Sequence, residues 1–143
     1  MAVISLDLVS IRRAQADDQE VLRKLYDVEI DLSASGKFFT YLAEDIEPFG
    51  FVSAGEGEII ALYIKPEYRR KGMGSKLLVR GLSILKLRGF ESALCWLAEG
   101  DTPALEILLS LKFKADGSER LTNTRDGATR TEKGYRLGLS EYF

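Results

Sequence analysis

The feature that most constrains this chain is an apolar run that leads into a basic, glycine-containing loop and then into a helix. Residues 58–64, EIIALYI, are nearly all apolar, which predicts a central strand covered on both faces. Pro66 ends that strand, a loop follows over residues 67–74, and a leucine-rich helix then runs to Gly89. Unpaired N–H groups and the dipole at a helix N-terminus attract anions, and glycine lets the backbone approach a ligand closely. The segment therefore predicts an anion-binding site.

The charges around the loop indicate which anion it would hold. Within twelve residues there is one acid, Glu67, and there are five bases: Lys65, Arg69, Arg70, Lys71 and Lys76. This density favours a polyphosphate over a single carboxylate. Two common nucleotide-binding loops do not fit, because the Walker A spacing is absent and Leu77 stands where the dinucleotide fingerprint needs a third glycine.

The remaining patterns predict an alternation of strands and helices. We expect strands at 4–11, 38–43, 49–54, 90–97, from 113 and at 129–139, helices at 17–30 and 102–111, a turn or short helix at 33–36, and a polar connection at 116–127. Asp17 and Glu20 resemble a capping box, and Thr102 is expected to cap the last helix with Pro103 at its first position. The order β-α-β-β-β-α-β-α-β-β predicts an α/β fold with a sheet of about seven strands.

Composition limits the chemistry. A chain of 143 residues predicts a single domain over residues 1–143. It has no histidine and one cysteine, which excludes Ser-His-Asp and Cys-His catalysis and the usual zinc sites, so we expect no metal. The sequence carries no signal-peptide or membrane-spanning pattern, and a lone cysteine is typical of a reducing compartment. We therefore expect a cytoplasmic protein that binds no membrane.

Charge is distributed unevenly along the chain. The net charge is −2, which argues against a nucleic-acid partner. Residues 1–60 carry a balance of −7 and residues 61–143 a balance of +5. The basic half is suited to an anionic cofactor and the acidic half to a cationic substrate, and the alternative is two differently charged, solvated faces.

The loop contains the motif R-x-x-G-x-G as Arg69-Arg70-Lys71-Gly72-Met73-Gly74. With the strand before it, the helix after it and the order of the later elements, it resembles the GNAT superfamily of N-acetyltransferases over residues 11–139. The resemblance implies a mixed, mostly antiparallel sheet that splays between its fourth and fifth strands, with helices on both faces. It also implies an acetyl-CoA-dependent N-acetyltransferase in which a primary amine attacks the thioester directly, without a metal.

The resemblance further implies which residues hold acetyl-CoA. The backbone of the fourth strand would pair with the pantetheine arm through Leu62, Tyr63 and Ile64. The loop would wrap the pyrophosphate through Arg69, Arg70, Lys71, Gly72, Met73, Gly74 and Ser75. Asp101 and Ala104 would contact the pantetheine side, although the family usually has asparagine where this chain has Asp101. Aspartate accepts the same hydrogen bonds but cannot donate one as asparagine does.

The catalytic residues follow from the same resemblance. Glu58 matches the glutamate that serves as general base in the histone-acetylating branch of the family, and the alternative is a polar end of the strand. The usual general acid is a tyrosine in the last helix, but this chain has Leu108 there. Another donor would have to replace it, and by residue type the candidates are Tyr63, Tyr135 and Tyr142, each of which could instead serve packing.

Other residues favour structural roles. Cys95 lies in an apolar strand and is expected to be buried and inert, and Trp96 beside it is expected to belong to the core. A basic cluster flanks the last hairpin and predicts a solvated face or, alternatively, an acceptor-side contact; its members are Arg120, Arg125, Arg130 and Lys133. The acidic half points to a cationic acceptor such as a polyamine, an aminoglycoside, a lysine side chain or a protein N-terminus.

Two further classes of function remain as alternatives. One is a regulatory module that binds an acyl-CoA with little or no turnover, which Asp101 and Leu108 favour. The other is a kinase-like or dinucleotide-binding protein, against which the missing loop signatures argue. Homodimers are common in the GNAT superfamily, so a homodimer is possible here.

Overall fold

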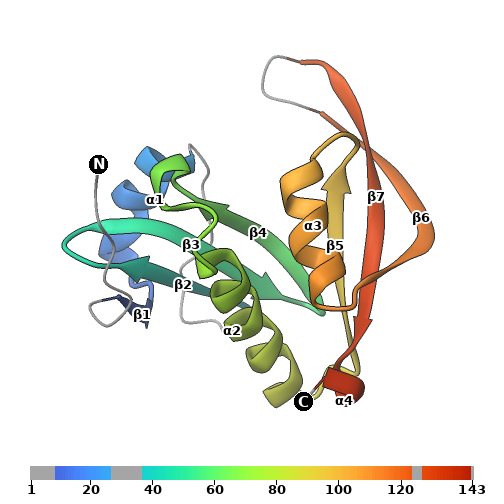
Figure 1. Ribbon diagram of the computed structural model, residues 1–143, viewed down its shortest axis with the longest axis horizontal. Helices are drawn as coiled ribbons and strands as arrows, with labels where there is room; N and C mark the ends of the chain where they lie inside the picture. Colours follow the sequence, from blue (N-terminus) through green and yellow to red (C-terminus); the bar gives the residue numbers. More distant parts are fainter. Residues whose placement is uncertain (1–8, 27–36, 124–126, 143) are drawn as a thin grey trace.

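The computed structural model describes residues 9–26, 37–123 and 127–142, and Figure 1 shows their arrangement. One mixed sheet has the strand order β1-β2-β3-β4-β5-β7-β6. The strands are β1 (Ser10–Arg13), β2 (Phe38–Glu44), β3 (Pro48–Gly55), β4 (Glu58–Ile64), β5 (Ser92–Ala98), β6 (Lys114–Asn123) and β7 (Thr129–Gly138). All neighbours pair antiparallel except β4 and β5, which are parallel. The expected α/β fold with a seven-stranded, mostly antiparallel sheet is confirmed.

Helices cover both faces of the sheet. Helix α1 (Gln19–Tyr26) follows the short turn η2 (Ala16–Asp18), α2 (Met73–Leu87) follows η3 (Pro66–Tyr68), and α3 (Thr102–Ser110) and α4 (Leu139–Tyr142) complete the set among the described residues. Side chains alternate along a strand, so neighbours enter different cores. Leu42 packs with Leu22 and Leu25 of α1, whereas Ala43 packs with the residues of α2 and α3.

The fourth and fifth strands separate soon after they begin. They pair only through Glu58 with Leu94 and Ile59 with Cys95, and then diverge into a V that is visible in Figure 1. The prediction that 58–64 is covered on both faces is therefore wrong. Only Ile59 and Ile64 of β4 are buried, and Ile60 is 50% exposed. The expected buried strand at 90–97 is corrected in the same way, since Ala93 is the buried residue of β5.

The N-terminal elements are shorter than expected within the described residues. Strand β1 begins at Ser10, whereas the expected strand was 4–11, and residues 1–8 lie outside the described part of the chain. The helix expected at 17–30 is α1 preceded by η2, and its last residues lie outside the described ranges, as does the turn expected at 33–36.

The expected capping box is also shifted by two residues. The pair that forms it is Gln15 and Asp18 rather than Asp17 and Glu20. The Asp18 carboxylate accepts a hydrogen bond from the Gln15 backbone N–H at 2.7 Å and two from the Arg12 guanidinium at 2.9 Å. Asp18 is only 8% exposed, and these contacts hold its pKa below the ordinary value. The strand and the helix are tied together here by a charge that the apolar pattern does not indicate.

The polar connection expected at 116–127 is wrong over most of its length, because β6 occupies Lys114–Asn123. This strand lies at the edge of the sheet and is nearly all exposed, so it has no apolar alternation. Its order comes from pairing with β7, interrupted by an irregularity between Ala115 and Glu119. A pattern that reports burial cannot detect such a strand.

Candidate active site at the opening between two strands

The basic loop, residues 69–74, lies between η3 and the first turn of α2. Gly72 precedes the helix with φ 81°, and Arg70 also has a positive φ of 64°. Such a conformation costs a residue other than glycine about 1–2 kcal/mol. No side chain caps α2, and its first turn holds no acidic residue. Backbone turns of this kind direct N–H groups toward one point and make an anion-binding concavity.

The two glycines of the loop have different reasons for being glycine. Around Gly72 nothing lies within 4 Å of the position that a Cβ would take, so the requirement there is its left-handed conformation. A Cβ on Gly74 would instead come within 3.1 Å of the Ile107 Cδ1 atom. Gly74 therefore allows the first turn of α2 to pack closely against α3.

The side chains around the loop are basic and largely without partners among the described residues. Arg69, Arg70, Lys71 and Lys76 are all exposed, and none of them forms an ion pair with a described acid. Arg69 has a second role, because its Nε donates to the Ile64 carbonyl at 2.8 Å and its guanidinium lies 5.6 Å from the centre of the Tyr63 ring. The loop therefore combines open N–H groups with positive charge.

The V leaves one side of β4 open beside this loop. Beyond Ile59, no described strand pairs with the β4 edge that faces β5. Leu62 packs toward α2 and Tyr63 toward α1, and both are half-buried. An open strand edge offers backbone N–H and C=O groups to an extended ligand. The basic loop lies at the C-terminal end of this edge.

Helix α3 begins on the other arm of the V, after β5 (Figure 1). Its N-cap is Asp101 and not the expected Thr102, and the Asp101 Oδ1 atom accepts a hydrogen bond from the Ala104 N–H at 3.3 Å. Thr102 thus becomes the first helical residue. Asp101 is exposed, so its carboxylate also meets solvent at the open end of the V.

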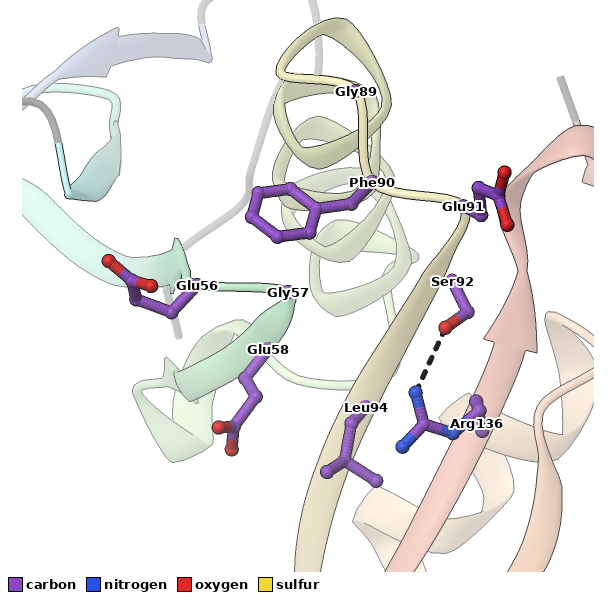
Figure 2. A pocket seen from close by; sticks show the side chains of 9 residues that line it. All are labelled: Glu56, Gly57, Glu58, Gly89, Phe90, Glu91, Ser92, Leu94 and Arg136. Carbon is purple, nitrogen blue, oxygen red and sulfur yellow. Dashed lines mark hydrogen bonds between the residues drawn. The ribbon is translucent and has the colours of Figure 1, made fainter.

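At the closed end of the V, Glu58 lines a pocket of about 390 Å³. It projects on the face that carries Leu94, opposite to the face where Ile59 packs against α2. Glu58 is half-buried and has no hydrogen bond or ion pair with another described residue. Figure 2 shows the carboxylates of Glu56 and Glu91, which also line the pocket, turned away from that of Glu58. Glu58 is therefore available to a bound molecule.

Arg136, which the sequence pattern did not single out, lines the same pocket as Glu58. Arg136 of β7 lines the pocket and is held by the Ser92 hydroxyl at 2.9 Å and the Asp116 carboxylate at 3.4 Å. Hydrogen bonds from Ser118, followed by Arg136, lower the pKa of Asp116. The only sequence signal was the period-two alternation of 130–136, which assigns residues to a face but not to a pocket.

Comparison with known proteins decides the family. The family model described as the acetyltransferase (GNAT) family matches residues 8–113. This chain belongs to the GNAT family. Its motif, its splayed strands and the order of its elements agree with that membership, so the resemblance inferred from the loop is confirmed.

Individual relatives are more distant. YuaI of Bacillus subtilis strain 168, an uncharacterized N-acetyltransferase, is 37% identical over 60 residues, which cover 36% of this chain and 35% of YuaI. The chain matches only about a fifth to a third of the length of its curated relatives. The dodecameric spermidine N-acetyltransferase from Vibrio cholerae superimposes with a TM-score of 0.77 at 16% identity, covering 96% of this chain and 97% of that one.

A solved structure with a bound cofactor shares the fold. The structure of yncA from Salmonella typhimurium, which contains its cofactor acetyl-CoA, has a TM-score of 0.72 at 18% identity and covers 92% of this chain and 94% of that one. At this identity the likeness establishes the GNAT fold alone. The placement of a cofactor in this chain stays a proposal.

The position at which the family resemblance implies a proton donor holds Leu108 of α3. Its side chain is 2% exposed and packs in the core. Of the three tyrosine candidates, Tyr63 packs toward α1 and Tyr135 toward α2 and α3, and the Tyr142 side chain lies outside the described part. The sequence expectation that one of them donates a proton stays a prediction.

The residues expected to be structural differ from expectation in detail. Cys95 and Trp96 are half-buried rather than fully buried. Desolvation, followed by nearby carboxylates, raises the pKa of the Cys95 thiol to about 12, so the thiol stays protonated at neutral pH. The basic cluster is more than a solvated face. Arg120 and Arg130 both bind the buried Glu132 carboxylate, at 2.8 and 3.0 Å.

Members of this cluster also contact other residues. The Arg120 guanidinium also lies 4.5 Å from the centre of the Trp96 ring, and Lys133 lies 3.6 Å from Glu99. Arg125 lies outside the described residues. The described residues contain no cluster of three metal-ligating side chains and no helix long and apolar enough to cross a membrane.

Proposed function

We propose that this chain is an acetyl-CoA-dependent N-acetyltransferase that acetylates a primary amine by direct attack. The observation that carries the proposal is the opening between β4 and β5, which lies beside the uncapped, basic N-terminus of α2. An apolar strand edge and an anion-binding helix end, placed together, suit a molecule with an extended apolar arm and a pyrophosphate.

Different residues along the opening would bind different parts of the cofactor. The backbone of Leu62, Tyr63 and Ile64 would pair with the pantetheine arm. The pyrophosphate would bind the N–H groups and side chains that surround α2, namely Arg69, Arg70, Lys71, Gly72, Met73, Gly74 and Ser75. Asp101 and Ala104, at the start of α3, would border the pantetheine from the other arm. Supporting this division is the absence of ion pairs between the loop bases and described acids.

Glu58 is the proposed general base. An amine of the lysine type has a pKa of about 10.4, so it must lose a proton before it can attack. Its nitrogen would then bond to the thioester carbonyl carbon, the C–S bond would break, and the sulfur would leave as the CoA thiolate. The first proton of the ammonium would pass to the Glu58 carboxylate before the attack, directly or through one water. The second would leave the nitrogen for solvent as the amide forms. Its lack of described partners and its place in the pocket support this role.

The leaving thiolate has no evident donor, because Leu108 stands at the usual position. Loss of a general acid costs a typical enzyme about 10²–10⁴-fold in rate. A thiol with a pKa of about 8.5 already leaves tolerably well as a thiolate. We therefore expect turnover that is slow for this family rather than absent.

The acceptor proposed here is a cationic amine. Three glutamates line the pocket, Glu56, Glu58 and Glu91, and its one basic residue, Arg136, is already held by Asp116 and Ser92. An acidic pocket raises the local concentration of cations. The Vibrio cholerae protein of the same fold is a spermidine N-acetyltransferase and dodecameric. By analogy, polyamines are the first acceptors to test, and self-association into at least a dimer is the proposed assembly. A cytoplasmic location stays a prediction.

The alternative is an acyl-CoA-binding regulatory module without efficient turnover. Leu108 and Asp101 favour it, because both depart from the residues that the family usually carries. The two functions share the binding step and differ in transfer.

The deciding experiment incubates the chain with radiolabelled acetyl-CoA and a panel of amines: spermidine, an aminoglycoside, a lysine peptide and peptides with free N-termini. Transfer above the uncatalysed rate to any of them supports the enzyme. Binding of CoA without transfer to any amine supports the module, and the absence of both would contradict the two together.

A further inference from the structure

The turn between β2 and β3 contacts the residue that precedes the basic loop. The Tyr68 ring, in η3, stacks on the Phe49 ring with centroids 4.2 Å apart and planes 6° from parallel. The Tyr68 hydroxyl donates a hydrogen bond to the Asp45 Oδ2 atom at 3.3 Å. Tyr68 immediately precedes Arg69, so these contacts fix the residue from which the loop departs.

The support under Tyr68 is itself held in place. Phe49 is fully buried at the start of β3. The other oxygen of Asp45 accepts hydrogen bonds from the backbone N–H groups of Ile46 and Glu47, at 2.6 and 3.4 Å, so the carboxylate closes its own turn. Partial burial, followed by the Asp45 charge, raises the pKa of the Tyr68 hydroxyl, which therefore stays protonated and able to donate.

Both ends of the loop are anchored, but the middle is not. At the start, the Lys65 N–H donates to the Phe49 carbonyl at 2.8 Å and Arg69 binds the Ile64 carbonyl. At the end, Met73 is 1% exposed in the core and Gly74 packs on Ile107. Residues 70–72 are exposed between these anchors. The anchors at the two ends therefore set how residues 70–72 run, and Tyr68 belongs to the anchor on the N-terminal side.

We propose that Asp45 and Tyr68 are positioning residues that set the geometry of the basic loop, and through it the affinity for the pyrophosphate of CoA. A binding constellation must be held within about 0.5 Å to work well, and the residues that hold it lock it by packing and hydrogen bonds. Neither residue touches the ligand in this account. The inference rests on the proposed function for its ligand, but its structural part does not.

The test compares two ligands and four variants. Calorimetry gives the Kd of CoA, and competition gives the Kd of pantetheine, which lacks the pyrophosphate. Tyr68→Leu removes both the stack and the hydroxyl, and we expect CoA to bind roughly tenfold more weakly while pantetheine changes less than about twofold. Tyr68→Phe keeps the stack and is expected to lose only about two- to threefold for CoA. An equal loss for both ligands, or no loss for CoA, would overturn the proposal.

A matched pair separates the hydrogen bond from charge. Asp45→Ala and Glu47→Ala remove the same charge from the same turn, but only Asp45 accepts a hydrogen bond from Tyr68. We expect Asp45→Ala to weaken CoA binding relative to Glu47→Ala. If the two variants bind CoA equally well, the Asp45 part of the proposal is wrong.

Hydrogen exchange tests the inference without a ligand. In Tyr68→Leu the amides of residues 69–75 should exchange faster than in the wild type, while those of the last turns of α2 should not change. Uniformly faster exchange, or unchanged exchange in 69–75, would contradict positioning. If the wild type fails to bind CoA, the proposed function fails, and this measurement still decides whether Tyr68 holds the loop.

Discussion

Two helices begin at the opening of the V, and their N-termini differ in how they are capped. Helix α2 begins after Gly72 with no capping side chain and no acid in its first turn, among basic side chains. Helix α3 begins at Asp101, whose carboxylate accepts a hydrogen bond from the Ala104 N–H. A carboxylate at the N-cap accepts a hydrogen bond from one of the free N–H groups, and its charge interacts favourably with the helix dipole. The terminus of α3 thus carries its own anion, whereas that of α2 is left for one from outside.

The difference also separates where this chain agrees with its family from where it departs. The α2 arm carries the full motif, while the α3 arm carries Asp101 for asparagine and Leu108 for tyrosine. In the proposed function, the pyrophosphate would bind beside α2, and departure of the thiol would depend on the residues of α3. We therefore expect this chain to bind CoA well for a GNAT protein and to transfer acetyl groups slowly.

The largest expected effect comes from closing the open terminus. Gly72→Glu places an acid at the start of α2 and a side chain at φ 81°, and we expect CoA affinity to fall by about 100-fold or more. Calorimetry measures it. Gly117→Glu is the matched control, because Gly117 has φ 86° and equally open surroundings but lies in β6. Equal losses of CoA affinity in the two variants would mean that damage to the fold, and not closure of the α2 terminus, weakens binding.

Next in size is the effect of Glu58→Gln. It tests whether the chain still catalyses transfer although α3 departs from the family at Asp101 and Leu108. Loss of the base should lower kcat by about 100-fold at pH 7, with the Kd of CoA unchanged. The control is Glu56→Gln, which changes an exposed carboxylate of the same pocket and should alter kcat by less than about threefold. A Glu58→Gln protein that transfers acetyl groups at the wild-type rate would remove Glu58 from the mechanism.

A smaller effect is expected when the charge on the α3 terminus is removed. Asp101→Asn keeps a good N-cap, so stability should change by less than about 0.5 kcal/mol. Because a negative charge leaves the opening that the polyanionic cofactor would occupy, CoA should bind about two- to fivefold more tightly at low salt, and the gain should shrink at high salt. Titrations at two ionic strengths measure it. Weaker binding at both would show that the Asp101 carboxylate is a ligand contact.

The smallest effects distinguish the two loop glycines. Gly72→Ala forces a side chain into a left-handed conformation and should lower the free energy of unfolding by about 1 kcal/mol. Gly74→Ala meets only the flexible end of Ile107 and gains helix propensity, so its net change should be within about 0.5 kcal/mol. Chemical denaturation compares them. A larger loss of unfolding free energy for Gly74→Ala would show that close packing of Gly74 against Ile107 matters more than the left-handed conformation of Gly72.

The loop and the order of the elements could be predicted from the sequence, because both depend on residues that are close in the chain. Gly89 has the positive φ expected of a glycine that follows a helix, and the strands and helices come in the expected order. At Gly89 the turn closes with hydrogen bonds from Gly89 and Phe90 back to Lys86 and Leu85. These features depend on residues that are close in the chain.

The errors arise where distant parts of the chain decide. The run at 58–64 is apolar enough for a fully buried strand, yet Ile60 is half-exposed. It lies where the register with β3 shifts and pairing with β5 has ended, so it has no partner on either strand. Strand β6 has no apolar face and depends on β7 for its order. The error at Thr102 is local instead, because Asp101 caps α3 and aspartate is a stronger capping type than threonine. The tie from Asp45 to Tyr68 joins residues 23 positions apart, which no local pattern indicates.

The most direct test of the central claim is a calorimetric titration of the wild-type chain with CoA. The account predicts a single site with a Kd in the micromolar range, because the α2 terminus and its bases are open to the pyrophosphate. No detectable binding at millimolar CoA would contradict it. The GNAT fold would then stand, and the site between β4 and β5 would have to hold something other than CoA.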